Sequence, residues 1–230
     1  MRAIVTGASR GIGLELTRQL LARGDTALAA CRSPESATAL AALAPAHPDR
    51  LHVHACDIGD GKSVAAFAAE LGDAAIDLLV NNAGVWGGEH QSLGDLDVDE
   101  ALRTYEVNAL GALRVTLAVL PHLRRGQGKK IVHVTSGLGS ILDNTSGGYY
   151  GYRMAKAALN MASRSLAVDL RAERITSVVI DPGWVRTDMG GPGASLTAEA
   201  SVQGMLREID AVTLERSGAF LRWRGGDFPF

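Results

Sequence analysis

The sequence predicts an α/β fold in which one parallel β-sheet is covered by helices on both faces. Short apolar runs alternate from end to end with stretches whose apolar residues recur at helical spacing. Strands that are apolar at successive positions are typical of parallel sheets buried on both faces. No proline- or serine-rich linker, repeat or low-complexity segment interrupts this alternation. We therefore expect a single domain over residues 1–230.

The apolar runs predict each strand in turn. Strands are expected at residues 3–6, 26–31, 51–55, 76–80, 130–135 and 175–180, with a short last strand at 219–222, which makes a sheet of about seven strands. The first helix is expected from about Ile12, with Leu16 and Leu20 on its apolar face. A long helical segment is expected from about 97 to 123, and a late helix near 197–209.

Composition argues against several classes of protein. The 230 residues carry a net charge of −2, and charges of both signs are interspersed, without the basic patch of a nucleic-acid-binding protein. No apolar run is long enough to cross a bilayer and the start does not resemble a signal peptide, so we expect a cytoplasmic protein with no membrane partner. The two cysteines and six histidines lack the spacings of a disulfide scaffold or zinc site, and no metal is expected.

The first functional motif follows the first expected strand. Gly7, Gly11 and Gly13 form a G-x-x-x-G-x-G turn, and a helix begins at about Ile12. A glycine turn before a helix N-terminus is typical of nucleotide phosphate binding. The same residues also fit the G-x-S-x-G turn of a serine hydrolase, with Ser9 as nucleophile. Only six residues precede the motif, so no earlier strand supplies an oxyanion-hole donor, and phosphate binding is favoured.

The end of the second expected strand indicates which nucleotide is bound. A carboxylate at this position would hold the free ribose hydroxyl of NAD. The sequence has Cys31 and Arg32 there instead, and Arg10 lies in the glycine turn. Guanidinium groups are suited to bidentate contact with phosphate. The two arginines therefore favour NADP(H) over NAD(H), although both could be ordinary solvated side chains.

Further motifs occur in a fixed order along the chain: "CDI" at 56–58, "NNAG" at 81–84, "VNALG" at 107–111, "VTSGLGS" at 134–140, "YRMAK" at 152–156 and "DPGWVRTDM" at 181–189. With "TGASRGIG" at 6–13, they resemble the short-chain dehydrogenase/reductase family, and within it the subgroup of C-factor-like proteins and sniffer-like carbonyl reductases. The resemblance implies a Rossmann fold and an NADPH-dependent oxidoreductase that reduces a ketone or aldehyde, or oxidises an alcohol. It equally leaves open an NAD(P)-binding signalling or sensor protein of C-factor type with little turnover.

The resemblance implies four catalytic residues: Asn108, Ser136, Tyr152 and Lys156. Tyr152 and Lys156 are four apart on an expected helix, so they share one face, and the ammonium would lower the phenol pKa toward that of a general acid/base. Ser136 would bind the substrate oxygen, and Asn108 would kink its helix and join a water-mediated proton relay to Lys156. Ser140 competes with Ser136. The neighbouring Tyr149 and Tyr150 have no lysine four residues on.

The resemblance also implies contacts with each part of the cofactor. Asp57 and Ile58 would contact adenine, the segment 82–84 would approach the ribose, and the segment 182–187 would bind the nicotinamide. The expected cofactor-binding residues are Gly7, Ser9, Arg10, Gly11, Ile12, Gly13, Arg32, Asp57, Ile58, Asn82, Ala83, Gly84, Tyr152, Lys156, Pro182, Gly183, Val185 and Thr187. The substrate would be a small carbonyl compound or alcohol in a pocket near Trp86, Leu138, Trp184 and Met189. Pairing through the helices that carry Asn108 and Tyr152 would give a homodimer or homotetramer.

Three other patterns carry weaker hypotheses. The residues Asp95, Asp97, Asp99 and Glu106 mimic a calcium loop, but Glu100 occupies the position that needs glycine, and helix capping by Asp97 explains the run more simply. His52 and His54 share one face of an expected strand and are interpreted as packing or edge residues. Cys31 and Cys56 end strands expected to be neighbours near the adenine site, where oxidation would impair cofactor binding.

Overall fold

The computed structural model describes residues 1–230 and contains one parallel sheet of seven strands in the order β3-β2-β1-β4-β5-β6-β7. This confirms the predicted fold class. Chain order reverses direction between β1 and β4, which makes their carboxyl ends the topological switch point of the sheet. The strands are β1 (Arg2–Thr6), β2 (Thr26–Cys31), β3 (Leu51–Ala55), β4 (Leu78–Asn81), β5 (Lys130–Val134), β6 (Thr176–Asp181) and β7 (Phe220–Arg222).

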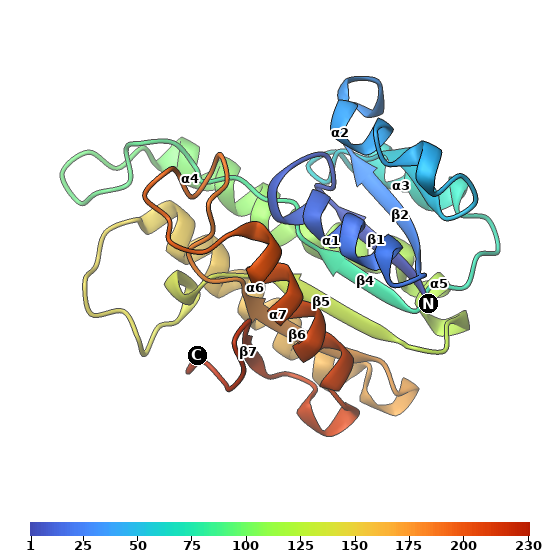
Figure 1. Ribbon diagram of the computed structural model, residues 1–230. Helices are drawn as coiled ribbons and strands as arrows, with labels where there is room; N and C mark the ends of the chain where they lie inside the picture. The colour runs from blue at the N-terminus through green and yellow to red at the C-terminus, as the bar shows by residue number, and fades with distance from the viewer.

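Helices cover both faces of the sheet (Figure 1). The helices are α1 (Gly11–Ala22), α2 (Thr38–Ala41), α3 (Gly61–Glu70), α4 (Val98–Tyr105), α5 (Ala112–Arg125), α6 (Tyr150–Asp169) and α7 (Ala198–Ala211). Buried side chains of α1 and α7 pack on one face, which is the near face in Figure 1, and those of α3, α5 and α6 pack on the other. The strands thus supply both cores, which explains why their sequences are apolar at successive positions.

The long helical segment expected over 97–123 is interrupted. A π-helical turn at Glu106–Gly111 separates α4 from α5. Asn108 lies within this turn, so the expected break at Asn108 takes the form of a change in helix type. Such π turns are rare and occur mostly at functional sites. The amino end of α4 is capped as expected, because the Asp97 carboxylate accepts a hydrogen bond from the Glu100 N–H at 2.9 Å.

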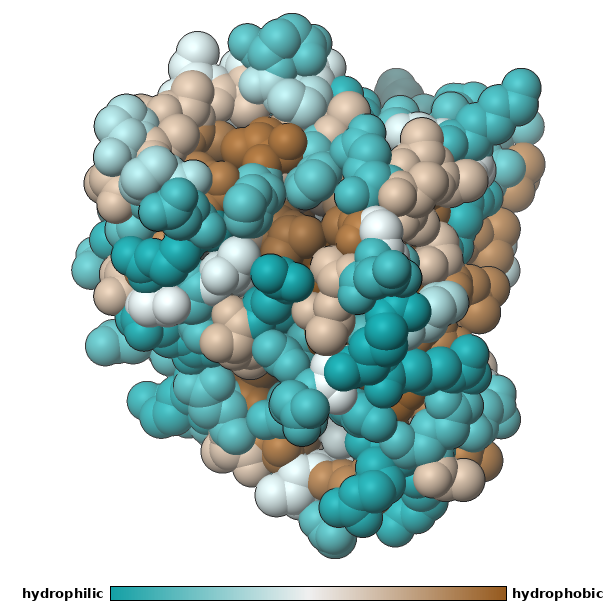
Figure 2. Space-filling view, turned by 90° about the vertical axis from the view of Figure 1, so that its right-hand side faces the viewer, coloured by the Kyte–Doolittle hydropathy of each residue, from teal (hydrophilic) through white to brown (hydrophobic).

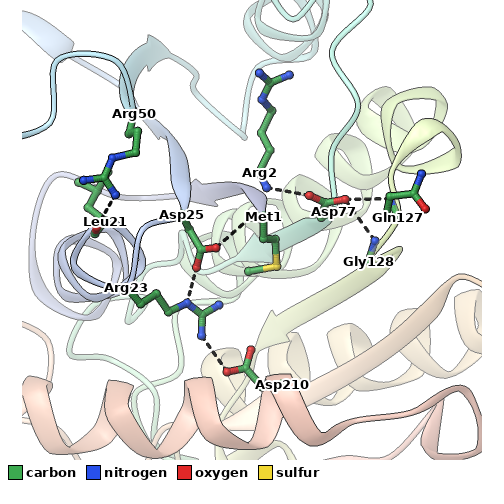
Figure 3. Close-up of polar contacts among 10 residues, drawn as sticks. All are labelled: Met1, Arg2, Leu21, Arg23, Asp25, Arg50, Asp77, Gln127, Gly128 and Asp210. Carbon is green, nitrogen blue, oxygen red and sulfur yellow. Dashed lines mark hydrogen bonds and ion pairs between the residues drawn. The ribbon is translucent and has the colours of Figure 1, made fainter.

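Two aspartates fix the amino end of the central strand β1 (Figure 3). The Asp25 carboxylate lies 3.1 Å from the Met1 ammonium and pairs with Arg23, which in turn contacts Asp210 of α7 at 2.8 Å. The Asp77 carboxylate accepts a hydrogen bond of 2.8 Å from the Arg2 N–H. These contacts hold the strand whose other end carries the glycine turn.

Asp77 also joins β1 to the segment that leads into β5. Its carboxylate accepts hydrogen bonds from the backbone N–H groups of Gln127 and Gly128, at 2.8 and 3.2 Å. Burial disfavours the charged carboxylate, but the three backbone donors outweigh it and hold the pKa of Asp77 below its ordinary value. The charged form is therefore the one that stabilises this junction.

Polar and charged residues, which are interspersed along the sequence, lie at the edge of the sheet and on the surface of the molecule. β3 is an edge strand, and His54 pairs there with Glu70 of α3 at 2.9 Å, so His52 and His54 lie at the sheet edge as interpreted. The face in Figure 2 is largely hydrophilic, with apolar residues in separate patches. No helix of the chain combines the length and apolar character needed to span a bilayer.

Candidate functional site

A cleft of about 1100 Å³ lies at the carboxyl ends of the strands, across the switch point. The segments after β1, β2, β3, β4, β5 and β6 all reach it, together with the first turns of α1 and α6. Of the residues expected to bind a cofactor, only Gly13 is not on its surface. The others lining it are Gly7, Ser9, Arg10, Gly11, Ile12, Arg32, Asp57, Ile58, Asn82, Ala83, Gly84, Tyr152, Lys156, Pro182, Gly183, Val185 and Thr187.

The glycine turn has a conformation that other residues would strain. Gly7 and Gly11 have φ values of +65° and +54°, in the left-handed region. Gly13 is required for a different reason, because a Cβ atom there would lie 2.2 Å from the Gly7 carbonyl oxygen. Helix α1 begins at Gly11 with no side-chain cap and no acidic residue in its first turn. Its free N–H groups and positive dipole end therefore favour an anion.

Thr6 at the end of β1 and Asn82 after β4 support the glycine turn. The Thr6 hydroxyl accepts hydrogen bonds from the N–H groups of Asn82 and Ala83, at 3.0 and 3.1 Å. The Asn82 amide donates back to the Thr6 carbonyl at 2.9 Å and to the Gly7 carbonyl at 3.3 Å. The Asn82 side chain thus positions the turn, a contact that sequence reasoning did not anticipate.

The cleft continues past the ends of β2 and β3. Arg32 and Asp57 line it there, and the Cys56 N–H bonds to the Cys31 carbonyl at 2.8 Å, as expected for neighbouring strand ends. The two thiols belong to cores on opposite faces of the sheet. Burial raises the pKa of Cys56 to about 12, which disfavours the reactive thiolate.

Tyr152, Lys156 and Ser136 converge at the opposite end of the cleft. Tyr152 and Lys156 lie in the first two turns of α6 and are only 7% and 5% exposed. The Lys156 ammonium lies 5.6 Å from the centre of the Tyr152 ring and donates to the Val134 carbonyl at 2.9 Å. Ser136 follows β5, and its Oγ accepts the Leu138 N–H at 3.1 Å, so its own proton is free to be donated.

Burial dominates the electrostatics of this group. Burial raises the pKa of Tyr152 above its ordinary value, the charge of Asp181 raises it further, and a hydrogen bond with Ser136 opposes the rise. Burial also lowers the pKa of Lys156 to about 8. The expectation that Lys156 depresses the Tyr152 pKa is therefore not met in the protein alone, because desolvation disfavours both charged forms.

The alternative residues are separated from the cleft or lack the geometry. Ser140 is buried away from its surface, and its hydroxyl accepts the Asp143 N–H at 3.0 Å. Tyr149 does line the cleft, but it is 47% exposed and precedes α6. Tyr150 does not line it.

Asn108 is buried behind the cleft and bound at both ends of its amide. Its Oδ1 accepts the Val85 N–H and its Nδ2 donates to the Val85 carbonyl, each at 2.8 Å. A Cβ on Gly84 would lie 2.9 Å from the same Oδ1. The Asn108 side chain therefore holds the segment after β4 in place, and that segment leads directly to Trp86.

Gln91 is a buried polar residue that the sequence did not single out. Its Nε2 donates to the Trp86 and Gly88 carbonyls, at 3.1 and 3.0 Å, and its Oε1 accepts the Tyr152 N–H at 2.9 Å. The Trp86 ring lies 4.7 Å from the Tyr152 ring. Gln91 thus ties the loop after β4 to the start of α6. Only the tertiary structure identifies it, because it lies 61 residues from Tyr152 in sequence.

Aromatic and apolar groups also line part of the cleft. Leu138, Trp184 and Met189 line it with Trp86, as expected from the sequence. The Trp86 ring also lies 5.3 Å from the Tyr149 ring. Loops after β4 and β5 extend at the left of Figure 1, beyond the carboxyl ends of the strands.

Comparisons with known proteins agree with this geometry. Residues 1–195 match the family model for short chain dehydrogenases. The chain is 52% identical to C-signal of Myxococcus xanthus over 165 residues, which are 72% of this chain and 99% of C-signal. Its structure superposes on carbonyl reductase Sniffer of D. melanogaster with a TM-score of 0.94 and 32% identity, covering 100% and 99% of the two chains.

A second solved structure is an NADPH-bound carbonyl reductase from chicken fatty liver, with a TM-score of 0.93, 33% identity, and coverage of 100% of this chain and 98% of that one. These likenesses extend over the whole seven-stranded sheet and not only the glycine turn. Since the family model also spans well over half of the residues, the chain belongs to the short-chain dehydrogenase family of oxidoreductases.

Proposed function

We propose that this protein is an NADPH-dependent reductase of ketones or aldehydes that also catalyses the reverse oxidation of alcohols. The observation that carries the proposal is that Tyr152, Lys156 and Ser136 line the same cleft as the glycine turn after the central strand β1. The cofactor, when bound, supplies the hydride. The residues of the chain then need to orient the carbonyl group, stabilise its oxygen and deliver one proton.

Each of the three residues, and Asn108 with them, has a defined role in this proposal. Tyr152 donates a proton to the carbonyl oxygen, since a phenol whose pKa is at or above its ordinary value is protonated at neutral pH. Ser136 donates its free hydroxyl proton to the same oxygen as negative charge develops there. Lys156 binds the ribose next to the nicotinamide, and Asn108 acts indirectly, by holding the segment after β4 in place through its two hydrogen bonds to Val85.

The cofactor-binding residues fit a phosphorylated dinucleotide. The uncapped N-terminus of α1 suits the pyrophosphate, and Arg10 and Arg32 both line the cleft where the adenosine phosphate would lie. Arg10 pairs with the exposed Asp188 at 3.1 Å, a contact that screening makes weak and easily exchanged for phosphate. The likeness to a reductase crystallised with NADPH supports the same choice.

Replacing Arg32 with alanine is expected to weaken NADPH binding by about tenfold, because one charge-assisted contact to phosphate is lost. NADH has no such phosphate, so its affinity should change little. Titration of both nucleotides into each variant by calorimetry measures the two effects. Equal losses for NADPH and NADH would contradict the assignment of Arg32 to the phosphate.

A panel of carbonyl compounds assayed through NADPH absorbance tests the reaction itself. The apolar lining of the cleft makes aldehydes and hydrophobic ketones the first substrates to try. Substrate-dependent oxidation of NADPH is the expected result. Tight NADPH binding without consumption by any compound would instead favour the second candidate function.

That second candidate is a nucleotide-binding signalling or sensor protein with little turnover. The observation in its favour is the 52% identity to a protein named C-signal. A sensor needs the cofactor-binding residues of the cleft but not a proton donor such as Tyr152 beside Ser136, so the reductase is the better supported function.

We also propose that the protein forms a homo-oligomer through α5 and α6. Large apolar side chains on these helices are exposed: Leu117, Met154, Met161 and Val168 are between 57% and 66% exposed. Burying such side chains against a second copy is favourable by about 25 cal/mol for each Å² of apolar surface removed from water. A dimer or tetramer is expected in analytical ultracentrifugation, and Met161→Glu should dissociate it. A monomeric parent protein would contradict the proposal.

A further inference from the structure

Asp181 is a carboxylate in the wall of the cleft that the sequence motifs left without a role. It ends β6, lines the cleft together with Ser136 and Tyr152, and is only partly exposed. Buried carboxylates are costly unless they are paired or accept hydrogen bonds. Its position among the reacting groups therefore calls for a functional explanation.

The contacts of Asp181 are made with the turn that carries the serine. Its Oδ1 accepts the Gly137 N–H at 2.9 Å, and Gly137 directly follows Ser136. The Ser136 Oγ accepts the N–H of the next residue, Leu138, at 3.1 Å. Asp181 and Ser136 thus bind successive N–H groups of one turn, and that turn is short and 3₁₀-helical.

We propose that Asp181 is a positioning residue of the reductase site, which fixes the Ser136 turn and adds a negative charge to the wall of the cleft that Tyr152 also lines. This inference rests on the proposed function above. The charge makes the phenolate less favourable, so it keeps Tyr152 in the protonated form that reduction requires.

The other charged groups near Tyr152 are few. Lys156 lies on the same helix as Tyr152. His133 lies on β5, where burial and, to a lesser degree, the Lys156 charge lower its pKa to about 3, so His133 is neutral. On α4, Glu100 and Arg103 pair with each other at 2.7 Å on the surface. Burial raises the pKa of Asp181 above its ordinary value. The N–H groups of Gly137 and Gly183 oppose this rise, and so do the charges of Arg222 and Arg224 on the β7 side. Asp181 is the acidic group that acts on the pKa of Tyr152.

Asp181→Asn separates charge from geometry, because asparagine keeps an oxygen that can accept the Gly137 N–H. Loss of the negative charge should lower the Tyr152 pKa by about one unit. In oxidation the phenolate is needed, so the acid limb of the kcat profile should move to lower pH by the same amount. Asp181→Ala, which also loses the turn contact, should in addition reduce the plateau kcat by about tenfold.

A measurement independent of turnover distinguishes failure of this inference from failure of the proposed function. Difluorotyrosine incorporated at position 152 titrates at lower pH than tyrosine, and its fluorine resonance reports the phenol directly. Asp181→Asn should shift this titration midpoint down by about one pH unit. Asp181→Glu, which keeps the charge, and Asp188→Asn, which removes a different and exposed carboxylate of the same cleft, should leave it unchanged.

Asp181→Ser provides a second neutral variant if the asparagine variant does not fold, as judged by circular dichroism. An unchanged midpoint in a folded neutral variant would overturn the inference, and so would an equal shift in Asp188→Asn. If the midpoint shifts but no carbonyl compound is reduced, the inference about the phenol stands and the proposed reductase activity fails.

Discussion

Replacing Tyr152 with phenylalanine is expected to reduce turnover by about 10³-fold with little change in NADPH affinity. The proposed reaction takes its proton from this phenol, which lines the cleft with Ser136, and general acid catalysis contributes about 10²- to 10⁴-fold. The ring remains in phenylalanine, so its packing 4.7 Å from the Trp86 ring is kept. Steady-state kinetics of a carbonyl substrate and nucleotide titration measure the two quantities.

Tyr149→Phe is the matched control for this experiment. It removes a hydroxyl from another tyrosine of the same cleft that also packs against Trp86, at 5.3 Å between ring centres. Its turnover should stay close to that of the parent, because Tyr149 has no lysine one helical turn on. Full turnover in Tyr152→Phe would show that Tyr152 is not the proton donor. Unchanged biological activity in Tyr152→Phe with bound cofactor would instead support the sensor.

Gly13→Ala is expected to abolish detectable nucleotide binding and to lower the free energy of unfolding by about 1–3 kcal/mol. The new methyl group would lie 2.2 Å from the Gly7 carbonyl oxygen and 2.5 Å from the Asn82 amide nitrogen. Both atoms belong to the hydrogen-bonded junction between β1 and β4. Because these hydrogen bonds hold the two atoms in place, the glycine turn itself has to move. Nucleotide titration and denaturant unfolding measure the two losses.

Gly94→Ala controls for the general effect of a glycine substitution. A Cβ there has no atom within 4 Å, and its backbone does not have a positive φ. Both stability and nucleotide affinity should stay at the parent values or rise slightly, since alanine restricts the unfolded chain. Retained nucleotide binding in Gly13→Ala would show that the turn tolerates side-chain bulk and would weaken its assignment to the phosphate.

Secondary structure was predicted most accurately where apolar residues recur along the chain at the spacing of a strand or a helix. The expected ranges of β2 and β3 coincide with the observed strands, and the others differ by two residues or fewer at each end. The segment over 97–123 is helical as expected, but its apolar spacing gives no sign that the kink expected at Asn108 is a π turn. A π turn adds one residue without changing composition, so it becomes visible only in the backbone.

The electrostatics of the site were the least predictable feature. Four-residue spacing correctly placed Tyr152 and Lys156 in one part of the cleft. It does not tell how deeply they are buried, and burial is the main cause of the raised Tyr152 pKa. Solvent exposure depends on packing from all sides, which a local spacing does not encode.

The sequence by itself determined the parallel sheet, the glycine turn and the order of the family motifs, because each depends on residues that are close along the chain. Only the tertiary structure decided that Gln91 holds the Tyr152 backbone, that Asn82 supports Gly7 and that Asp181 faces the serine turn. These contacts join residues 44 to 75 positions apart. Their partners are set by strand order and helix packing, so no local pattern of residues reveals them.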